Sequence, residues 1–195
     1  MASDARIAIP SQTLSGAATA HLSYARREVM LAAVAPVLRA LAERYARLLE
    51  KHLGARLVSV VLFGSVARGD AIAGSDIDLL IVARELPPGQ FARKQLLAVA
   101  DADIEADLER AAAEGIEGRF ARLVRTPEEA ARIVPLYLDM TEDAALLVDR
   151  DGFFAGVLDR LRASLTRLGS HRVRLGRTWY WDLKPDLKPG EVFEL

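Results

Sequence analysis

The sequence predicts an α/β protein in which a short, mixed sheet has helices on one face, with an N-terminal helical extension and a C-terminal extension. Two apolar runs, residues 57–63 and 77–82, have the length and composition of buried strands. Segments with helical spacing precede and follow them. A glycine-bearing loop joins the two runs, and two carboxylates open the second strand.

The composition is that of one ordinary domain with extensions. The chain has 195 residues, of which 51% are hydrophobic and 27% are charged, so it can bury a core. Its 26 Lys and Arg residues nearly balance its 27 Asp and Glu residues, for a net charge of −1. This balance removes the electrostatic reason to expect broad nucleic-acid binding, so a nucleotide or protein substrate is favoured over a polynucleotide.

The sequence shows no sign of disulfides, zinc sites, a signal segment or a membrane span. The absence of cysteine excludes disulfides and thiolate zinc sites. The three histidines, His21, His52 and His171, lack the spacing of metal ligands. Residues 1–20 contain no apolar signal segment, and no apolar run is as long as a membrane span, so we expect a cytoplasmic protein with no membrane partner.

We divide the chain into three parts: an N-terminal arm and helix over residues 1–37, a central domain over 38–150, and a C-terminal helix and extended tail over 151–195. Residues 17–53 have a strongly helical composition. Pro36 is expected to divide that helix in two, because proline removes a helical hydrogen bond and restricts the residue before it. Gly54 is placed to end the second half as a left-handed cap.

Asp76 and Asp78 are the residues that most clearly indicate a function. They stand two apart at the start of a predicted strand, where residues i and i+2 project from the same face. Two carboxylates held side by side repel each other unless a cation lies between them. Oxygen ligands of this kind suit Mg²⁺ or Mn²⁺, which completes its shell with water and substrate phosphates.

Gly64 and Ser65 follow the first predicted strand directly. Glycine lets the backbone approach a ligand closely, and a helix that starts here would offer free N–H groups to phosphate oxygens. The sequence therefore predicts a metal-dependent nucleotide site, formed by this turn and the two carboxylates of the next strand.

The pattern G-S-x-A-R-G, followed by S-D-I-D-L-L-I, resembles the signature of the minimal nucleotidyltransferase domains of the DNA polymerase beta superfamily. The resemblance covers residues 38–149. It implies the nucleotidyltransferase fold and an enzyme that uses Mg²⁺ or Mn²⁺ and an NTP, with ATP the expected one. The matching residues are the phosphate-binding pair Gly64 and Ser65, the nucleotide-binding R-G step Arg68 and Gly69, and the catalytic metal pair Asp76 and Asp78.

Two roles for Arg68 follow from this pattern, and both stay open. Its guanidinium could stabilise the leaving pyrophosphate, or it could pair with Asp70 and brace the loop.

One part of the family's pattern is missing. Active members have a third carboxylate on the strand that follows the long helix, and here Arg122 occupies that place. An arginine neither binds Mg²⁺ nor acts as a base at neutral pH. A shifted strand register or the next helix could instead supply the acid, from Glu117, Asp139, Glu142 or Asp143. We retain Asp139 as the possible third metal ligand.

Two functions are consistent with these residues. The first is a metal-dependent nucleotidyltransferase that moves a nucleoside monophosphate, AMP above all, from an NTP to a hydroxyl of a small molecule or a protein. The second is a catalytically weakened nucleotide-binding module, such as an antitoxin-type partner protein, because loss of the third carboxylate impairs metal binding and base activation. The two extensions are expected to form a surface for a partner protein or for self-association.

The remaining elements follow from periodicity and capping signals. We expect one long helix over residues 90–114, a third strand over 118–125, a helix near 135–143 and an amphipathic helix over 152–168. The expected buried residues of the long helix are Phe91, Leu96, Leu97, Val99, Ile104 and Leu108.

Caps are predicted at two helices. Thr126, Pro127 and Glu129 have the arrangement of a capping box with proline in the first turn. Asp151 is expected to cap the amphipathic helix, and Gly169 is expected to end it.

The tail from residue 171 has the composition of extended segments and lies outside the transferase motif. Because side chains alternate along a strand, Trp179 and Trp181 share one face and Tyr180 lies on the other. Packing over the core is the favoured role of the tryptophans, and stacking on a nucleobase is the second possible role.

Overall fold

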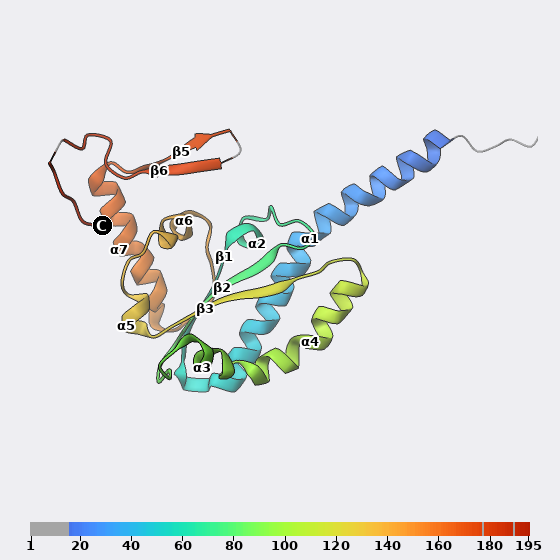
Figure 1. Ribbon diagram of the computed structural model, residues 1–195, viewed down its shortest axis with the longest axis horizontal. Helices are drawn as coiled ribbons and strands as arrows, with labels where there is room; N and C mark the ends of the chain where they lie inside the picture. The colour runs from blue at the N-terminus through green and yellow to red at the C-terminus, as the bar shows by residue number, and fades with distance from the viewer. Residues whose placement is uncertain (1–15, 177, 189) are drawn as a thin grey trace, which may run out of the picture.

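The central feature is a four-stranded mixed sheet in the order β3-β2-β1-β4 (Figure 1). The computed structural model describes residues 16–176, 178–188 and 190–195, so most of the predicted N-terminal arm lies outside the described residues. The strands are β1 (Leu57–Phe63), β2 (Asp76–Ala83), β3 (Arg119–Arg125) and β4 (Ala145–Asp149). β1 is antiparallel to β2 and β4, and β2 is parallel to β3, which confirms the predicted α/β fold with a mixed sheet.

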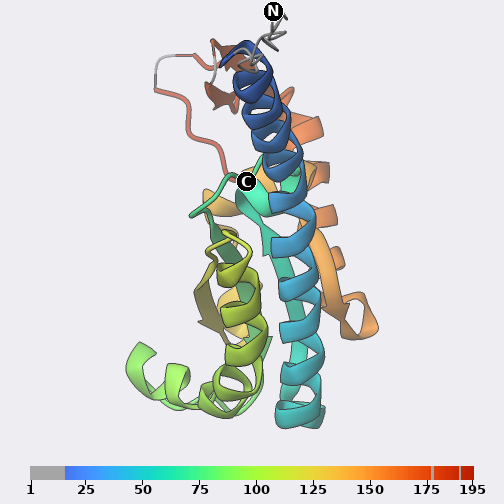
Figure 2. The same cartoon turned by 90° about the vertical axis from the view of Figure 1, so that its right-hand side faces the viewer.

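Helices cover both faces of this sheet, so the prediction of helices on one face is wrong. One face packs against α1 (Gly16–Leu53) and α4 (Ala98–Ala113), and the other against α6 (Leu136–Asp143) and α7 (Phe153–Leu168) (Figures 1 and 2). Successive residues of β2, such as Leu79 and Leu80, are buried in different core clusters. An unbroken apolar run is typical of a strand buried on both faces, which explains why the apolar residues of β2 do not alternate with polar ones.

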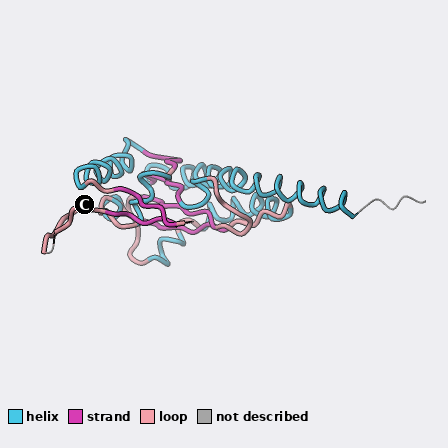
Figure 3. Tube along the Cα trace, turned by 90° about the horizontal axis from the view of Figure 1, so that it is seen from above, coloured by secondary structure: helices cyan, strands magenta, loops and turns pink. Residues whose placement is uncertain are grey.

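The first helix, α1, is continuous, so the predicted division at Pro36 is wrong. Pro36 lies inside the helix and is exposed. The turns after it bury Leu38, Tyr45 and Leu49 completely, and this packing offsets the local cost of the proline. The N-terminal turns of α1 project beyond the sheet (Figure 3). Gly54, with φ +53°, follows the helix as predicted and opens the short 3₁₀ helix η1 (Gly54–Arg56).

The long helix predicted after the second strand is two helices, α3 (Gln90–Gln95) and α4, with a break at Leu96 and Leu97. Leu97 and Ile104 are buried as expected, but Phe91 is 77% exposed and Val99 is 57% exposed. Arg93, rather than Phe91, is the buried residue of α3, and its guanidinium donates to Glu129 of α5 (Pro127–Ala130) at 2.6 and 2.9 Å. This ion pair orients α3 so that Phe91 faces outward.

The capping predictions have different outcomes. The capping box of Thr126 and Glu129 is present at α5 (Pro127–Ala130), as predicted. The predicted cap at Asp151 is wrong. Gly152 is the N-cap residue of α7, and the carboxylate of Asp149 accepts the backbone N–H groups of Phe154 and Ala155 at 2.9 and 3.0 Å.

Asp151 lies in the 3₁₀ helix η2 (Arg150–Gly152) with φ +54°. Gly169 ends α7 in the left-handed conformation, as predicted.

The C-terminal tail forms a two-stranded antiparallel sheet, β5 (His171–Leu175) and β6 (Thr178–Asp182), near α6 (Figure 1). We call these two strands the C-terminal hairpin. Among the described helices, none combines the length and the apolar character needed to cross a bilayer.

Candidate functional site

The chain reverses direction at the end of β1 and brings Gly64 against Asp78. Helix α2 (Gly64–Arg68) begins directly after Phe63, which is paired with Asp78 across the sheet. Gly64 has φ +72°, and a Cβ added to it would lie 2.2 Å from Asp78 Oδ2. Only glycine fits this position, because any side chain would displace the carboxylate and strain the backbone.

Asp76 and Asp78 lie on the same face of β2, as their spacing predicted. Asp76 is exposed and lies 3.7 Å from the Nε of Arg119, whereas Asp78 is half-buried. Burial raises the pKa of Asp78, the negative charge of Asp76 raises it further, and Arg68 partly opposes both. The site therefore concentrates negative charge at a partly desolvated position, which a cation would relieve.

The donor set is compatible with a hard divalent cation. Two carboxylates on one strand face supply oxygen ligands, and Mg²⁺ commonly uses one or two carboxylates and completes its shell from phosphates and water. Across the described residues, acidic and histidine side chains nowhere gather in a group of three or more suited to a metal. Asp139, the retained third ligand, thus does not join Asp76 and Asp78 in this structure.

Arg68 ends α2, and Gly69 follows it with φ +79°. The Nε of Arg68 donates to Asp70 Oδ2 at 3.2 Å, which is the bracing role considered for this arginine. Ser65 lies in the first turn of α2, and its carbonyl accepts the N–H of Asp70 at 3.0 Å. The predicted phosphate-binding residues thus lie together in α2 and at its C-terminal end, beside β2.

A cavity of about 160 Å³ lies between the start of α2 and helix α6. Its polar lining residues include Arg68, Asp139 and Asp143, and its apolar ones include Phe63 and Met140. Gly64 also lines it, so the cavity adjoins the predicted phosphate-binding turn. Asp76 and Asp78 are not among its lining residues.

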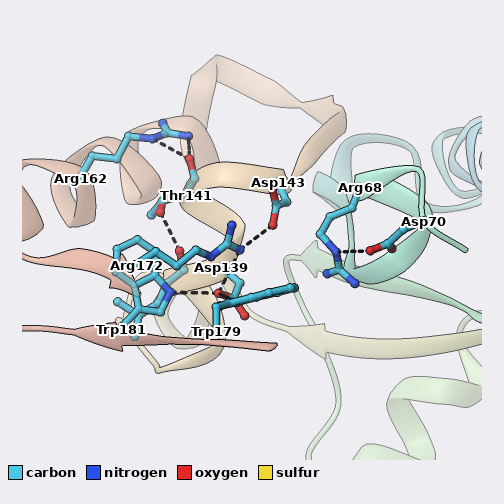
Figure 4. Close-up of polar contacts among 10 residues, drawn as sticks. Arg68, Asp70, Asp139, Thr141, Asp143, Arg162, Arg172, Trp179 and Trp181 are labelled. Atoms are coloured by element: carbon cyan, nitrogen blue, oxygen red, sulfur yellow. Dashed lines mark hydrogen bonds and ion pairs between the residues drawn. The ribbon is translucent and has the colours of Figure 1, made fainter. Parts of the chain in front are cut away.

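Asp139 binds the C-terminal hairpin. Its Oδ1 accepts hydrogen bonds from the indole Nε1 of Trp179 at 3.0 Å and of Trp181 at 2.9 Å (Figure 4). Arg172 Nη2 lies 3.4 Å from the same oxygen and 2.7 Å from Asp143 Oδ2. Burial alone would raise the pKa of Asp139, but the hydrogen bonds from the two indoles and the charge of Arg172 lower it overall.

Arg122 does not occupy the place of the missing third carboxylate. It pairs with Leu79 on β2 and faces α1 and α4, where its Nη1 donates to the hydroxyl of Tyr45 at 2.8 Å and to Asp101. The residue of β3 beside Asp78 on the carboxylate face is Ala121. The pattern match is therefore wrong by one residue, although its conclusion holds because β3 contains no acidic residue.

Glu117, Glu142 and Asp143 do not complete the metal site either. Glu117 is exposed and precedes β3, and Glu142 lies near the end of α6 without a place beside the carboxylate pair. Asp143 lines the cavity, but its carboxylate is paired with Arg172.

The hairpin contact with α6 is the part of the site that the sequence pattern does not predict. The one sequence feature that points to this contact is the spacing of Trp179 and Trp181, which places both indoles on one face of a strand. That spacing alone favours packing over the core. Trp181 packs against the core cluster beside α6 and α7, which confirms that prediction for this residue, and both indoles also reach Asp139, a residue far away in the sequence.

The nucleotidyltransferase domain family matches residues 43–139 of this chain. A curated protein of Methanocaldococcus jannaschii, named "Putative protein adenylyltransferase MJ1305", is 31% identical over 121 residues, which are 61% of this chain and 77% of that protein.

Two solved structures are also similar. A toxin-antitoxin structure with AMP-PNP is 16% identical, with a TM-score of 0.39, and covers 66% of this chain and 92% of its own. A structure from Sulfolobus solfataricus, described as "a putative nucleotidyltransferase", is 21% identical, with a TM-score of 0.37. The match covers 60% of this chain and 86% of that chain. The matched segment of the family includes β1, α2, β2 and the carboxylate pair. By its sequence, this chain belongs to the nucleotidyltransferase domain family.

Proposed function

We propose that this protein transfers a nucleoside monophosphate, specifically AMP from ATP, to a hydroxyl group in a divalent-metal-dependent reaction. The observation that supports this most is the position of Asp76 and Asp78 on one face of β2, with Asp78 directly against Gly64. A carboxylate pair beside a glycine turn brings a metal site and a phosphate site within reach of one triphosphate.

Asp76 and Asp78 would hold Mg²⁺ or Mn²⁺. The bound ion would supply charge neutralisation to the phosphates during transfer. Gly64 allows the triphosphate to approach the same backbone that Asp78 contacts, and Ser65 offers a hydroxyl and a backbone N–H in the first turn of α2. Arg68 would face the phosphates while its Nε stays on Asp70.

A protein hydroxyl is the acceptor that we favour over a small molecule. The curated relative from Methanocaldococcus jannaschii is named "Putative protein adenylyltransferase MJ1305", and the match to this chain spans 77% of its length. The near-neutral net charge of the chain also favours a protein over a polynucleotide acceptor.

The second candidate function is a nucleotide-binding module with weakened turnover, acting with a partner protein. One observation favours it: Ala121 lies beside Asp78 on β3, where a third carboxylate would be needed. General-base assistance typically contributes about 10²–10⁴-fold to a rate, so its loss would leave nucleotide binding intact while transfer becomes slow.

A labelling experiment separates these functions. The protein is incubated with Mg²⁺ and a cell extract, in parallel with ATP labelled at the α-phosphate and at the γ-phosphate. Nucleotidyl transfer moves only the α label to an acceptor, whereas kinase activity moves only the γ label.

The variants Asp76→Asn and Asp78→Asn should abolish transfer of the α label. The matched control Asp103→Asn, which replaces an exposed acid of α4 paired with His52, should not. Nucleotide binding without any transfer supports the module. Failure of ATP and Mg²⁺ to bind at all overturns both functions.

A further inference from the structure

The indole ring of Trp179 lies close to two guanidinium groups. Arg172 Cζ is 4.4 Å from the ring centroid, and Arg68 Cζ is 5.2 Å from it. Both distances are within the range of cation–π attraction. Arg172 belongs to the hairpin itself, but Arg68 belongs to α2 and to the predicted nucleotide-binding loop, so this ring connects the two parts of the chain (Figure 4).

The orientation of this ring is fixed from α6. The Nε1 of Trp179 donates to Asp139 at 3.0 Å, and the neighbouring strand adds the ion pair of Arg172 with Asp143 at 2.7 Å. Trp181 donates to the same Asp139 oxygen, but its ring has no such contact with Arg68 among the described residues. The two tryptophans therefore share one anchor and differ in one contact.

Arg68 has few polar partners among the described residues, although its own side chain is only 25% exposed. Its side chain makes one hydrogen bond to another described residue, from Nε to Asp70, whose own side chain is 58% exposed. A long side chain with a single hydrogen bond loses conformational entropy when it binds a ligand. Stacking against a fixed aromatic face reduces that loss and leaves the Nη donors available for a planar, bidentate contact with phosphate.

We propose that Trp179 is a positioning residue for Arg68, through which the C-terminal hairpin sets the affinity of the site for the triphosphate of its nucleotide. This inference rests on the proposed function, because it assigns a phosphate contact to Arg68. It adds an element that the family match does not include, since that match ends at residue 139 and the hairpin begins at His171.

The test compares variants that separate the ring from its hydrogen bond. Trp179→Phe keeps an aromatic face but loses the N–H bond to Asp139, Trp179→Leu loses both, and Trp181→Phe loses only the second bond to Asp139. Each is titrated by calorimetry with α,β-methylene-ATP and Mg²⁺, alone and in an Arg68→Ala background. We expect Trp179→Leu to weaken binding about three- to tenfold, and the two phenylalanine variants to weaken it less than about twofold.

The double-mutant cycle shows whether Trp179 affects nucleotide binding by positioning Arg68 or only by anchoring the C-terminal hairpin. If Trp179 acts through Arg68, then Trp179→Leu produces no additional loss once Arg68 is alanine. An equal loss in both backgrounds, or equal losses for Trp179→Phe and Trp179→Leu, overturns the inference.

A second readout does not depend on the nucleotide. The Nε–H signal of Arg68 in ¹⁵N-labelled protein, assigned with Arg68→Lys, should move in Trp179→Leu and stay in Trp181→Phe, because an aromatic ring shifts the signals of groups stacked on it. If the wild-type protein binds no analogue, the proposed function fails, and an unchanged Arg68 signal would show that the positioning fails as well.

Discussion

Asp78 occupies the space that a side chain on Gly64 would need. A Cβ on Gly64 would lie 2.2 Å from Asp78 Oδ2 and 3.1 Å from Asp78 Cγ. The two residues come from consecutive elements, α2 and β2, and this contact aligns the phosphate-binding turn with the carboxylate pair. The distance between the phosphate-binding turn and the carboxylate pair therefore depends on residue 64 being a glycine.

Gly64→Ala should weaken nucleotide binding strongly. The methyl group must displace the Asp78 carboxylate, and alanine is strained at φ +72°. We expect at least about a tenfold loss of affinity for α,β-methylene-ATP with Mg²⁺ by calorimetry. The stability cost should be about 1–3 kcal/mol, measured by urea unfolding.

The matched control is Gly169→Ala at the end of α7. Gly169 has a similar φ of +68°, but a Cβ there would have no neighbour within 4 Å. This variant should show the backbone strain without the loss of affinity. Equal affinity in Gly64→Ala and the wild type would show that the contact with Asp78 does not shape the site.

Asp78→Asn should stabilise the protein at neutral pH in the absence of metal. Burial, followed by the charge of Asp76, raises the pKa of Asp78 above the value of about 3.9 expected in the unfolded chain. The folded state then binds more protons than the unfolded state between these two pKa values, so stability falls as the pH rises through that interval. The neutral amide avoids this penalty.

Thermal unfolding in EDTA checks this prediction. The melting temperature of Asp78→Asn should exceed that of the wild type at pH 7, and the difference should shrink as the pH falls toward about 4. Addition of Mn²⁺ should raise the melting temperature of the wild type and not that of the variant. A wild type that is the more stable of the two at pH 7 without metal would contradict the argument.

Glu129→Gln should have the opposite pH dependence. The hydrogen bonds from Arg93 lower the pKa of Glu129 to about 2, well below the value of about 4.3 in an unfolded chain. The stabilisation is therefore complete above about pH 4.3 and is lost as the pH falls toward 2. Relative to the wild type, the variant should be less stable at pH 7 and should match it near pH 2, as measured by urea unfolding.

Glu105→Gln, an exposed acid on α4, provides the comparison for Glu129→Gln. A pH-independent deficit in Glu129→Gln would mean that the loss comes from packing rather than from the ion pair with Arg93.

Local patterns were sufficient to predict β1, β2 and the carboxylate pair. Continuous apolar runs indicated the two strands, and the i, i+2 spacing placed Asp76 and Asp78 on one face. To predict which face of the sheet Arg122 occupies, one needs the register between β2 and β3, which is a non-local property. An error of one residue in that register moves every side chain of the strand to the other face. The contact of Trp179 with α6 also depends on tertiary folding, because the strand pattern alone does not say which surface the hairpin covers.

The register of β3 predicts where a third carboxylate can be installed. Ala121 is paired with Asp78 and is partly exposed, so Ala121→Asp should place an acid beside the existing pair. Three oxygen ligands bind a divalent ion more tightly than two, and we expect Mn²⁺ affinity, measured by calorimetry, to rise about tenfold or more.

Arg122→Asp, the change that the sequence pattern alone would suggest, should fail to restore a metal site. Arg122 faces α1 and α4, where it pairs with Asp101 and the hydroxyl of the buried Tyr45, so an aspartate there adds a negative charge beside Asp101. Breaking a partly buried pair in this way should cost about 1–3 kcal/mol in urea unfolding and leave Mn²⁺ affinity unchanged. If Arg122→Asp tightened Mn²⁺ binding and Ala121→Asp did not, the register of β3 against β2, and with it the face assigned to the site, would be wrong.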